Sequence, residues 1–360
     1  MNSLKVVLYQ GRSVIQSTGG AEKVFCDLAS GLAESGHDVH AICSERKVGL
    51  PFYELSPKVK FNNLYGHKAW MGWYRVYRFF QVTQPDIVIC FFISDFIRAA
   101  ALYPKARFVL MLHCEPQFYL KKLKSYRRIM FNAVKSRLLA VQVLLPSYVD
   151  AAKAIHENVV VIPNGVDLSK KWQAQPSEST QIINIARFDK AHKRQHLLIE
   201  AFAQIADEFP EWALSLWGSQ ANKVYVDECK SLAQRLGLSA ERVRFCGITE
   251  DTKSVYEQAA FFVLPSAYEG FPLVVLEAMS ASLPVIALQD CEAAGQVITD
   301  GETGVICKNT ADDLARVLKS LMADPAKREA MGQNALASIE KYNRLNVVAA
   351  WNDLIKRLAK

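Results

Sequence analysis

Two α/β domains, each built around a parallel β-sheet, are the fold that this sequence predicts. Apolar runs of strand length alternate with helix-type runs along the chain, and strands separated by helices form parallel sheets with right-handed crossovers. A polar, turn-rich stretch with two prolines interrupts this alternation at residues 163–179 and predicts a linker. The length of 360 residues also fits two domains of ordinary size.

Predicted strands alternate with predicted helices in both halves of the chain. In the first half, predicted strands occupy residues 5–9, 38–43, 87–91, 108–113, 141–145 and 159–162, and apolar residues at helical spacing predict a helix at 21–35. In the second half, predicted strands occupy residues 182–186, 213–217, 243–245, 261–264 and 285–287. Predicted helices of this half occupy residues 194–207, 225–236 and 274–280, and a last helix is predicted at 347–358.

Composition places the chain among globular proteins with a sizeable core, because 51% of its residues are hydrophobic and 22% are charged. The net charge of +7 fits an anionic partner such as a nucleotide, a phospholipid surface or a nucleic acid, without choosing among them. The first residues predict a strand instead of a signal peptide, and no stretch approaches the roughly 18 apolar residues of a membrane-spanning helix. The eight cysteines form no CxxC pair, so we expect reduced, mostly buried thiols in a cytoplasmic protein.

The segment EGFPLVVLE, from Glu269 to Glu277, is the strongest functional signal. It lies between an apolar strand and a helix that begins near Leu273, and a helix N-terminus attracts phosphate through its unpaired N–H groups. Carboxylates at both ends of the segment can bind sugar or ribose hydroxyls, so phosphate between them suits a nucleotide-sugar. The plainer alternative is that Glu269 caps the helix and Glu277 is a solvated helix residue.

This pattern resembles the EX7E motif of retaining glycosyltransferases, and EGFPLVVLEAMS with the following LPVIA resembles glycosyltransferase family 4 nearly residue by residue. The resemblance covers essentially the whole chain and implies the GT-B fold, in which two Rossmann-like domains face each other across a cleft. It implies an acceptor-binding domain at residues 1–166 and a nucleotide-sugar-binding domain at 167–345. A C-terminal helix at 346–360 is then expected to pack back on the first domain.

The resemblance also implies roles for individual residues. Arg187 and Lys193, in NIARFDKAHKRQ, match the pair that grips the donor diphosphate, and two fixed cations can neutralise a leaving diphosphate without a metal. His113 ends a strand of the first domain and matches a histidine close to the transferred sugar. With Glu269, these three residues form the expected catalytic set. We expect His113 to bind a sugar hydroxyl and not to act as a nucleophile.

The first loop, with Gly19 and Gly20 before the first helix, resembles the GGAE loop of the family, and Glu22 is expected on the acceptor side. Taken alone, these residues equally fit a helix start with an acidic residue in its first turn. Gly218 ends a strand where the family usually has G-x-G, and Ser219 follows here instead. The full set expected to contact the donor is Gly19, Gly20, Arg187, Lys193, Gly218, Ile248, Gly270, Phe271, Pro272, Leu273 and Glu277.

The resemblance implies a retaining reaction in which the acceptor attacks on the face that the diphosphate leaves. The expected donor is a UDP-sugar, and no metal is expected, since the sequence contains no D-x-D. The expected acceptor is a glycan or a lipid-linked glycan in cell-surface polysaccharide or lipopolysaccharide biosynthesis.

We expect a cytoplasmic protein that lies peripherally on the inner face of the cell membrane. Residues 119–139 alternate basic with apolar residues, which is typical of a helix on an anionic membrane surface, although an ordinary surface helix with snorkelling lysines has the same pattern. The run 70–80 is aromatic and basic too. The basic charge has no recognisable nucleic-acid readout motif beside it, so no nucleic-acid partner is expected.

Three other functions compete with this prediction. A dinucleotide oxidoreductase would share the α/β alternation, but the sequence contains no G-x-G fingerprint. A nucleotide-sugar epimerase of the same overall fold would isomerise the donor without transferring it. A non-catalytic carbohydrate-binding protein is expected to have an eroded site, whereas Arg187, Lys193, Glu269 and Glu277 are all present.

Overall fold

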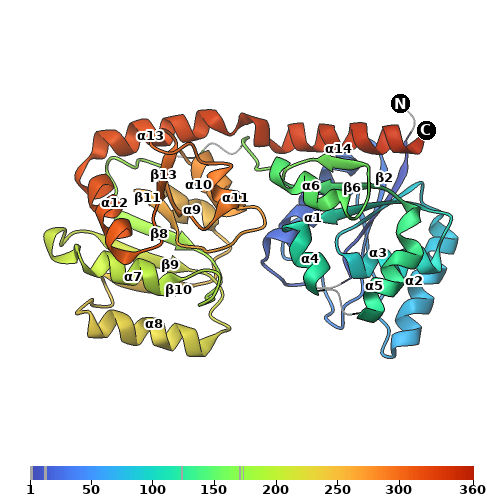
Figure 1. The fold of residues 1–360 in the computed structure, drawn as a ribbon, viewed down its shortest axis with the longest axis horizontal. Coiled ribbons are helices and arrows are strands. Elements are labelled where there is room, and N and C mark those ends of the chain that lie inside the picture. The colour runs from blue at the N-terminus through green and yellow to red at the C-terminus, as the bar shows by residue number, and fades with distance from the viewer. Residues whose placement is uncertain (1–2, 12–13, 123–124, 170–171, 173) are drawn as a thin grey trace. The chain divides into compact units, whose positions relative to one another are not determined.

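The computed structural model describes residues 3–11, 14–122, 125–169, 172 and 174–360. The chain forms two compact units, an N-terminal unit of residues 1–165 with 344–360, and a C-terminal unit of residues 166–343. The predicted boundaries lie after residues 166 and 345. Each unit is a parallel sheet covered by helices, as the alternating pattern predicted (Figure 1).

The N-terminal unit contains, within its described residues, a seven-stranded parallel sheet. Its strands, in spatial order, are β3 (Lys60–Asn63), β2 (Asp38–Cys43), β1 (Lys5–Tyr9), β4 (Ile87–Cys90), β5 (Arg107–Leu112), β6 (Leu138–Val143) and β7 (Val159–Val161). All four residues of β4 are buried, as expected for a central parallel strand. The direction of the strand order changes between β1 and β4, and ligands of such sheets bind at the carboxyl ends of the strands there.

Seven α-helices of the described N-terminal unit connect or cover these strands. They are α1 (Gly20–Glu34), α2 (Ala69–Thr83), α3 (Ile93–Leu102), α4 (Pro116–Lys122), α5 (Ser125–Val134), α6 (Val149–Lys153) and α14 (Arg344–Ala359), with the short 3-10 turns η1 (Lys135–Arg137) and η2 (Pro146–Tyr148). The C-terminal helix α14 packs on α1, where a side chain in place of Gly31 would approach Val348 to 2.4 Å. Arg344 and Asp27 add an ion pair of 3.7 Å to this contact.

The C-terminal unit contains, in its described part, a six-stranded parallel sheet. Its strands, in spatial order, are β10 (Val243–Gly247), β9 (Ala213–Trp217), β8 (Gln181–Ile185), β11 (Phe261–Leu264), β12 (Val285–Leu288) and β13 (Gly304–Cys307). Its helices are α7 (Gln195–Ala203), α8 (Lys223–Arg235), α9 (Thr252–Glu257), α10 (Leu273–Ser280), α11 (Glu292–Gly295), α12 (Ala311–Ala323) and α13 (Pro325–Ser338), with η3 (Ala206–Glu208) and η4 (Glu340–Tyr342). The strand order reverses direction between β8 and β11.

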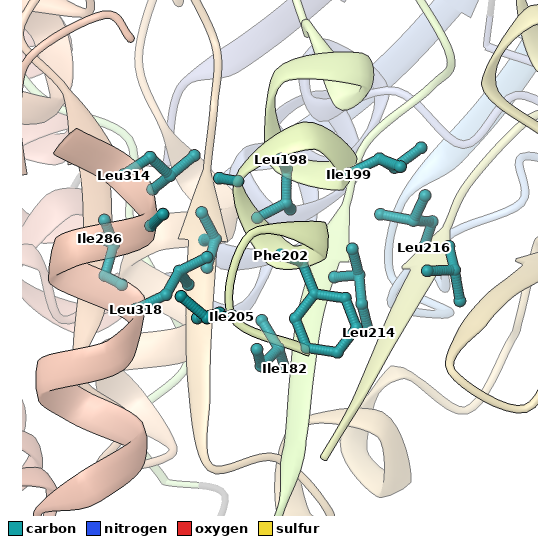
Figure 2. Close-up of a cluster of buried hydrophobic side chains, with 14 of the residues drawn as sticks. Ile182, Leu198, Ile199, Phe202, Ile205, Leu214, Leu216, Ile286, Leu314 and Leu318 are labelled. Carbon is teal, nitrogen blue, oxygen red and sulfur yellow. The ribbon is translucent and has the colours of Figure 1, made fainter. Parts of the chain in front are cut away.

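A hydrophobic cluster fixes the helix that follows β8 (Figure 2). Leu198 and Phe202 of α7 are fully buried, together with Leu214 of β9 and Leu318 of α12. Truncating one such leucine to alanine typically destabilises a protein by about 2–5 kcal/mol. Since α7 begins directly after the loop that carries Arg187 and Lys193, this packing also anchors that loop.

Several predicted elements differ from the structure. The edge strands β3 and β13 were not predicted; KFNN of β3 alternates poorly in hydrophobicity. The predicted strand 141–145 is β6, which begins and ends earlier, and the predicted helix 194–207 is α7 followed by η3. Helix α7 starts only at Gln195 because Arg194 adopts a left-handed backbone conformation, with φ 49°.

Composition predicted reduced and mostly buried cysteine thiols. The eight cysteines are free, and six of them are buried. Among the described residues, no helix combines the length and the apolar character needed to cross a membrane.

Candidate active site

The segment EGFPLVVLE forms the loop and helix that follow the buried strand β11 at the switch point of the C-terminal sheet. Pro272 occupies the N-cap of α10 and no side chain caps this helix end. In this first turn the N–H groups of Leu273 and Val275 donate to the carbonyls of Phe271 and Pro272 at 3.0 and 2.9 Å, so the helix start attracts an anion mainly through the positive end of its dipole. Gly270 lies in the loop, whereas Phe271 and Leu273 are buried and fix the helix start.

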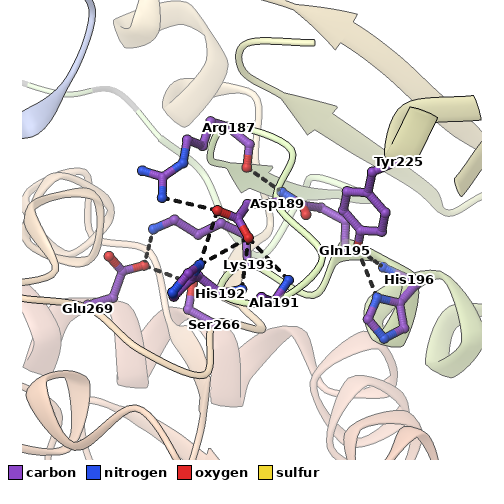
Figure 3. Close-up of polar contacts among 10 residues, drawn as sticks. All are labelled: Arg187, Asp189, Ala191, His192, Lys193, Gln195, His196, Tyr225, Ser266 and Glu269. Atoms are coloured by element: carbon purple, nitrogen blue, oxygen red, sulfur yellow. Dashed lines mark hydrogen bonds and ion pairs between the residues drawn. The ribbon is translucent and has the colours of Figure 1, made fainter. Parts of the chain in front are cut away.

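Glu269 is held by two side chains and does not cap α10. It accepts a hydrogen bond of 2.8 Å from Ser266 Oγ and forms an ion pair with Lys193 Nζ (Figure 3). The side chains of Lys193 and Glu269 are each only 13% exposed. A pair this well shielded from water fixes a carboxylate and an ammonium group beside the start of α10.

The loop between β8 and α7 brings Arg187 and Lys193 to the same edge of the sheet. Asp189 organises this loop, because its carboxylate accepts the N–H groups of Ala191 and His192 at 3.1 and 3.0 Å. The same carboxylate accepts a hydrogen bond of 3.1 Å from Arg187 and contacts the His192 ring at 3.1 Å (Figure 3). The backbone carbonyl of Asp189 accepts the N–H of Lys193 at 2.8 Å.

The electrostatics of this loop centre on Asp189. Burial by itself raises the pKa of its carboxyl group, but the hydrogen bonds from the His192 backbone and ring and from Arg187 outweigh burial and lower the pKa to about 2. The carboxylate is therefore charged throughout the neutral range and keeps Arg187 in place. The Arg187 side chain remains 63% exposed and is accessible to a ligand.

Backbone hydrogen bonds join this loop to its neighbours. The N–H of Ala267 donates to the carbonyl of His192 at 2.8 Å, which ties the loop to the one carrying Glu269. The N–H of Phe188 donates to the carbonyl of Ser219 at 3.1 Å. Gly218 is required at this junction, since it has φ 137° and a Cβ there would lie 2.1 Å from the carbonyl oxygen of Ala186.

Glu277 is not a solvated helix residue. It is half-buried on α10, and its Oε2 accepts a hydrogen bond of 3.0 Å from the hydroxyl of Tyr256, which is fully buried on α9. Ile248 lies beyond the end of β10 and is 55% exposed. An exposed apolar side chain and an oriented carboxylate are the kinds of group that contact a base and a ribose.

The N-terminal unit holds the remaining predicted residues at the carboxyl ends of its strands. Gly19 is the N-cap of α1, and a Cβ there would lie 2.1 Å from Glu22 Oε2, while Gly20 begins the helix. Glu22 is buried, and burial raises the pKa of its carboxyl group. Its Oε1 lies 3.4 Å from Gln10 Nε2, so Glu22 points toward the end of β1.

His113 directly follows β5, one residue beyond the end of the strand. Its ring stacks on Phe91 with 5.1 Å between ring centroids, and Phe92 lies at 5.8 Å. Burial lowers the pKa of His113 to about 4, so the ring is neutral at neutral pH. Within the described part of the chain, its buried Nε2 has no hydrogen-bond partner, which leaves one polar atom for a ligand.

The structure thus brings Arg187, Lys193 and Glu269 together at one edge of the C-terminal sheet, with Glu277 on the adjoining helix. Gly19, Gly20, Glu22 and His113 belong to the N-terminal unit. Asp189, Ser266 and Tyr256 were not predicted from the sequence. Asp189 had a signal, since an aspartate in the loop after a strand often closes a turn through its side chain.

Comparison with known proteins agrees with this geometry. The family model described as "Glycosyltransferase Family 4" matches residues 18–170, and the one described as "Glycosyl transferases group 1" matches residues 167–337. The chain belongs to glycosyltransferase family 4. It is therefore a transferase enzyme, and its two Rossmann-like units form the GT-B fold, as the sequence predicted.

Proteins that are similar in sequence to this chain are also named as glycosyltransferases. An uncharacterized glycosyltransferase of Haemophilus influenzae is 24% identical over 362 residues, which cover 95% of this chain and 97% of that protein. The lipopolysaccharide core biosynthesis mannosyltransferase LpcC of Rhizobium leguminosarum is 33% identical over 191 residues, or 50% of this chain and 54% of that protein. The solved structure of Anabaena HepE in complex with UDP-glucose matches with a TM-score of 0.80 at 18% identity, covering 98% of this chain and 100% of that chain.

Proposed function

We propose that this glycosyltransferase moves a sugar from a UDP-sugar to a hydroxyl group of a glycan or lipid-linked glycan, with retention of the anomeric configuration. The observation that carries the proposal is the Lys193–Glu269 pair beside the uncapped start of α10. A complex of the structural neighbour HepE contains UDP-glucose, which supports a UDP-sugar donor. The name of the Rhizobium relative supports an acceptor in lipopolysaccharide or polysaccharide biosynthesis.

The donor diphosphate is proposed to bind between the start of α10 and the cations Arg187 and Lys193. Lys193 then has two anionic partners, and Glu269 binds a hydroxyl of the transferred sugar while Lys193 and Ser266 both hold its Oε1. The bond from the anomeric carbon to the diphosphate oxygen breaks, and the acceptor oxygen bonds to the same face of that carbon. The acceptor proton passes to the departing diphosphate, whose charge the two cations stabilise.

The reaction is proposed to need no divalent cation. Among the described residues, no group of three or more His, Cys, Asp or Glu side chains could hold a metal ion. The two basic side chains and the helix start supply positive charge where a metal would otherwise act. Addition of EDTA is therefore expected to leave the rate of sugar transfer unchanged.

Other residues of the proposed site bind parts of the two substrates. Glu277, oriented by Tyr256, is proposed to accept hydrogen bonds from the ribose hydroxyls, and Ile248 is proposed to pack on the base. His113, with its unpartnered Nε2, is proposed to bind a sugar hydroxyl as a neutral ring. Glu22, behind Gly19 and Gly20, is proposed to face the acceptor. A cytoplasmic location stays a prediction.

A donor panel tests the proposal directly. Purified enzyme is incubated with UDP-, GDP- and ADP-sugars, and nucleotide release and thermal protection are measured for each. We expect the enzyme to hydrolyse one UDP-sugar slowly and to be protected by it against thermal unfolding. NMR of the transfer product should show the same anomeric configuration as the donor. An inverted product would refute retention. Isomerisation of the donor without UDP release would identify an epimerase, and binding without turnover would identify a carbohydrate-binding protein.

A further inference from the structure

Arg194 has an unusual backbone conformation for a residue beside the proposed donor site. Its φ of 49° lies in the left-handed region, in which a residue with a Cβ is disfavoured by about 5- to 30-fold. Four described residues other than glycine have such a φ, and the other three, Gln16, Gln84 and Ser282, lie outside the loops that follow β8, β11 and β12. A residue held in this conformation needs surrounding contacts that stabilise it.

The chain is anchored on both sides of Arg194. Gln195, the first residue of α7, is fully buried, and its Nε2 donates a hydrogen bond of 3.0 Å to the carbonyl of Arg187 (Figure 3). On the other side, the N–H groups of Lys193 and Arg194 both donate to the carbonyl of Asp189, at 2.8 and 3.1 Å. Because the core holds α7 in place, a change of φ at Arg194 would move the residues before it, and Lys193 is the first of these.

The Arg194 side chain forms an ion pair with Asp290 in the loop after β12. Its Nη1 lies 3.0 Å from Asp290 Oδ2, and the two side chains are 28% and 43% exposed. Exposed ion pairs usually contribute little, because both side chains must first be ordered. Here Asn309 orders the carboxylate, since its Nδ2 donates to Asp290 Oδ1 at 2.6 Å and its Oδ1 accepts the N–H of Asp290 at 3.2 Å. Asp290 is therefore a fixed anchor for Arg194.

Lys193 and Arg194 are adjacent in the sequence and pair with the loops of two neighbouring strands. Lys193 pairs with Glu269 in the loop after β11, and Arg194 pairs with Asp290 in the loop after β12. Strands β11 and β12 are hydrogen-bonded to each other in the sheet. The two ion pairs therefore hold the loop after β8 against two other loops at the edge where these strands end.

The loop after β12 also lies close to the Lys193–Glu269 pair. Cys291 follows Asp290 and is only 1% exposed. Burial and then the Glu269 carboxylate raise the pKa of the Cys291 thiol to about 12, whereas the Lys193 ammonium group acts in the opposite direction. A thiol that responds to both charges lies near both of them. A displacement of this loop would therefore reach Lys193 and Glu269.

We infer that Asp290 is a positioning residue of the donor site and acts through Arg194. The ion pair keeps Arg194 in the left-handed conformation, and this conformation places Lys193 for the donor diphosphate. Without the pair, the backbone at Arg194 relaxes toward a common conformation and Lys193 loses its alignment. The inference rests on the proposed contact of Lys193 with the diphosphate. The alternative is a surface ion pair that has no influence on ligand binding.

Isothermal titration of the full chain with UDP and with uridine tests this inference. The R194A variant lacks the ion pair but keeps a Cβ, so the left-handed conformation is lost and the affinity for UDP should fall by about tenfold. The D290A variant should show the same loss. The double variant R194A/D290A should lose no more than either single variant, because all three remove one interaction. Uridine has no diphosphate, so its affinity should stay unchanged in every variant.

The R194G variant separates the backbone conformation from the ion pair. Glycine adopts the left-handed conformation without a steric cost, so Lys193 should keep its place although the pair is lost, and the affinity for UDP should stay within about threefold of the parent value. Equal losses in R194A and R194G would overturn the inference. A parallel loss of UDP and uridine affinity in R194A would also overturn it, because general damage to the unit would then be the cause.

Two sets of control variants match the two parts of the inference. E228Q removes the charge from the 2.7 Å ion pair with Lys190 of the same loop and should keep both affinities. Gln84, at the C-cap of α2, has φ 46°, so Q84A and Q84G should differ in melting temperature but not in UDP affinity. Parental UDP affinity in both R194A and D290A would refute this inference alone. A parent enzyme that does not bind UDP would refute the proposed donor as well.

Discussion

Lys193 and Glu269 form the most closely held pair of the proposed site, since both side chains are only 13% exposed. Replacing Lys193 with Ala removes a preorganised cation from the departing diphosphate, and we expect turnover to fall by at least about 100-fold. Steady-state rates with the best donor measure this effect. Lys190 offers a control in the same loop, because its exposed side chain pairs with Glu228, and K190A should retain most of the activity. A K193A variant with near-parental turnover would exclude the diphosphate role.

Asp189 stabilises the loop that carries both cations. Its charged carboxylate accepts hydrogen bonds from the N–H groups of Ala191 and His192 and from the side chain of Arg187. Replacing Asp189 with Asn removes this charge, and we expect the free energy of unfolding to fall by about 1–3 kcal/mol at neutral pH. The folded-state pKa of about 2 lies below the ordinary value, so this stabilisation is complete above about pH 4 and is lost as the pH falls toward 2. Melting temperatures of parent and D189N enzyme should therefore differ at pH 7 and converge below pH 4. A constant difference across this range would show that charge is not the cause.

Tyr256 donates its hydroxyl to Glu277 at 3.0 Å and should orient that carboxylate for the ribose. Replacement with Phe keeps the buried ring and removes only the hydrogen bond, so we expect UDP and uridine affinities to fall together by about 3–10-fold. Isothermal titration with both ligands measures this. Tyr225 is a matched control, because its hydroxyl contacts His196 at 2.8 Å on α7, and Y225F should leave both affinities unchanged. If Y256F weakened UDP but not uridine, Glu277 would not be the ribose ligand.

At the scale of elements, the site depends on how closely the loops after β8 and β9 approach each other. A Cβ on Gly218 would meet the carbonyl of Ala186 at 2.1 Å, and the backbone φ of 137° already disfavours a side chain. We expect G218A to lower the free energy of unfolding by at least about 1–3 kcal/mol and to weaken UDP binding, because the loop of Arg187 must move. Chemical denaturation and UDP titration measure the two effects.

Gly237 separates these two causes. It also has a positive φ, of 76°, but a Cβ there would have nothing within 4 Å. The G237A variant should lose only the backbone contribution to stability and keep the UDP affinity of the parent enzyme. If G218A and G237A behaved alike, the close approach at Ala186 would not shape the site.

The order of elements was the most predictable feature, and side-chain contacts between elements were the least. Buried runs such as residues 261–264 predicted central strands, and the strand order then placed Lys193 and Glu269 at one edge. The contact between Tyr256 and Glu277 joins two helices through residues 21 positions apart in the sequence, and no local pattern indicates it. Strand β3 escaped prediction because an exposed edge strand needs no apolar alternation. The one-helix interpretation of residues 119–139 was wrong because the apolar residues there divide between core and surface.

At the scale of the whole molecule, the chain crosses from one unit to the other twice, and α14 returns to the N-terminal unit. The side chains proposed to bind the nucleotide, from Arg187 to Glu277, lie in the C-terminal unit, whereas Glu22 and His113 lie in the N-terminal unit. A ligand stabilises the folded state that binds it. UDP should therefore mainly stabilise the C-terminal unit, which is proposed to bind it.

The buried Trp351 of α14 allows the stability of the two units to be tested separately. Replacing it with Ala should destabilise the N-terminal unit by about 3–5 kcal/mol, because its side chain is only 2% exposed. Calorimetry of the full chain should then show an earlier transition for that unit, while the upward shift that UDP gives to the later transition stays as in the parent. The V348A variant removes a smaller side chain from the same contact with α1 and should destabilise the N-terminal unit by about 1–2 kcal/mol. It allows the same test if W351A does not fold. Loss of the UDP-dependent shift in V348A would mean that nucleotide binding requires the N-terminal unit, and the assignment of the nucleotide to the C-terminal unit alone would fail.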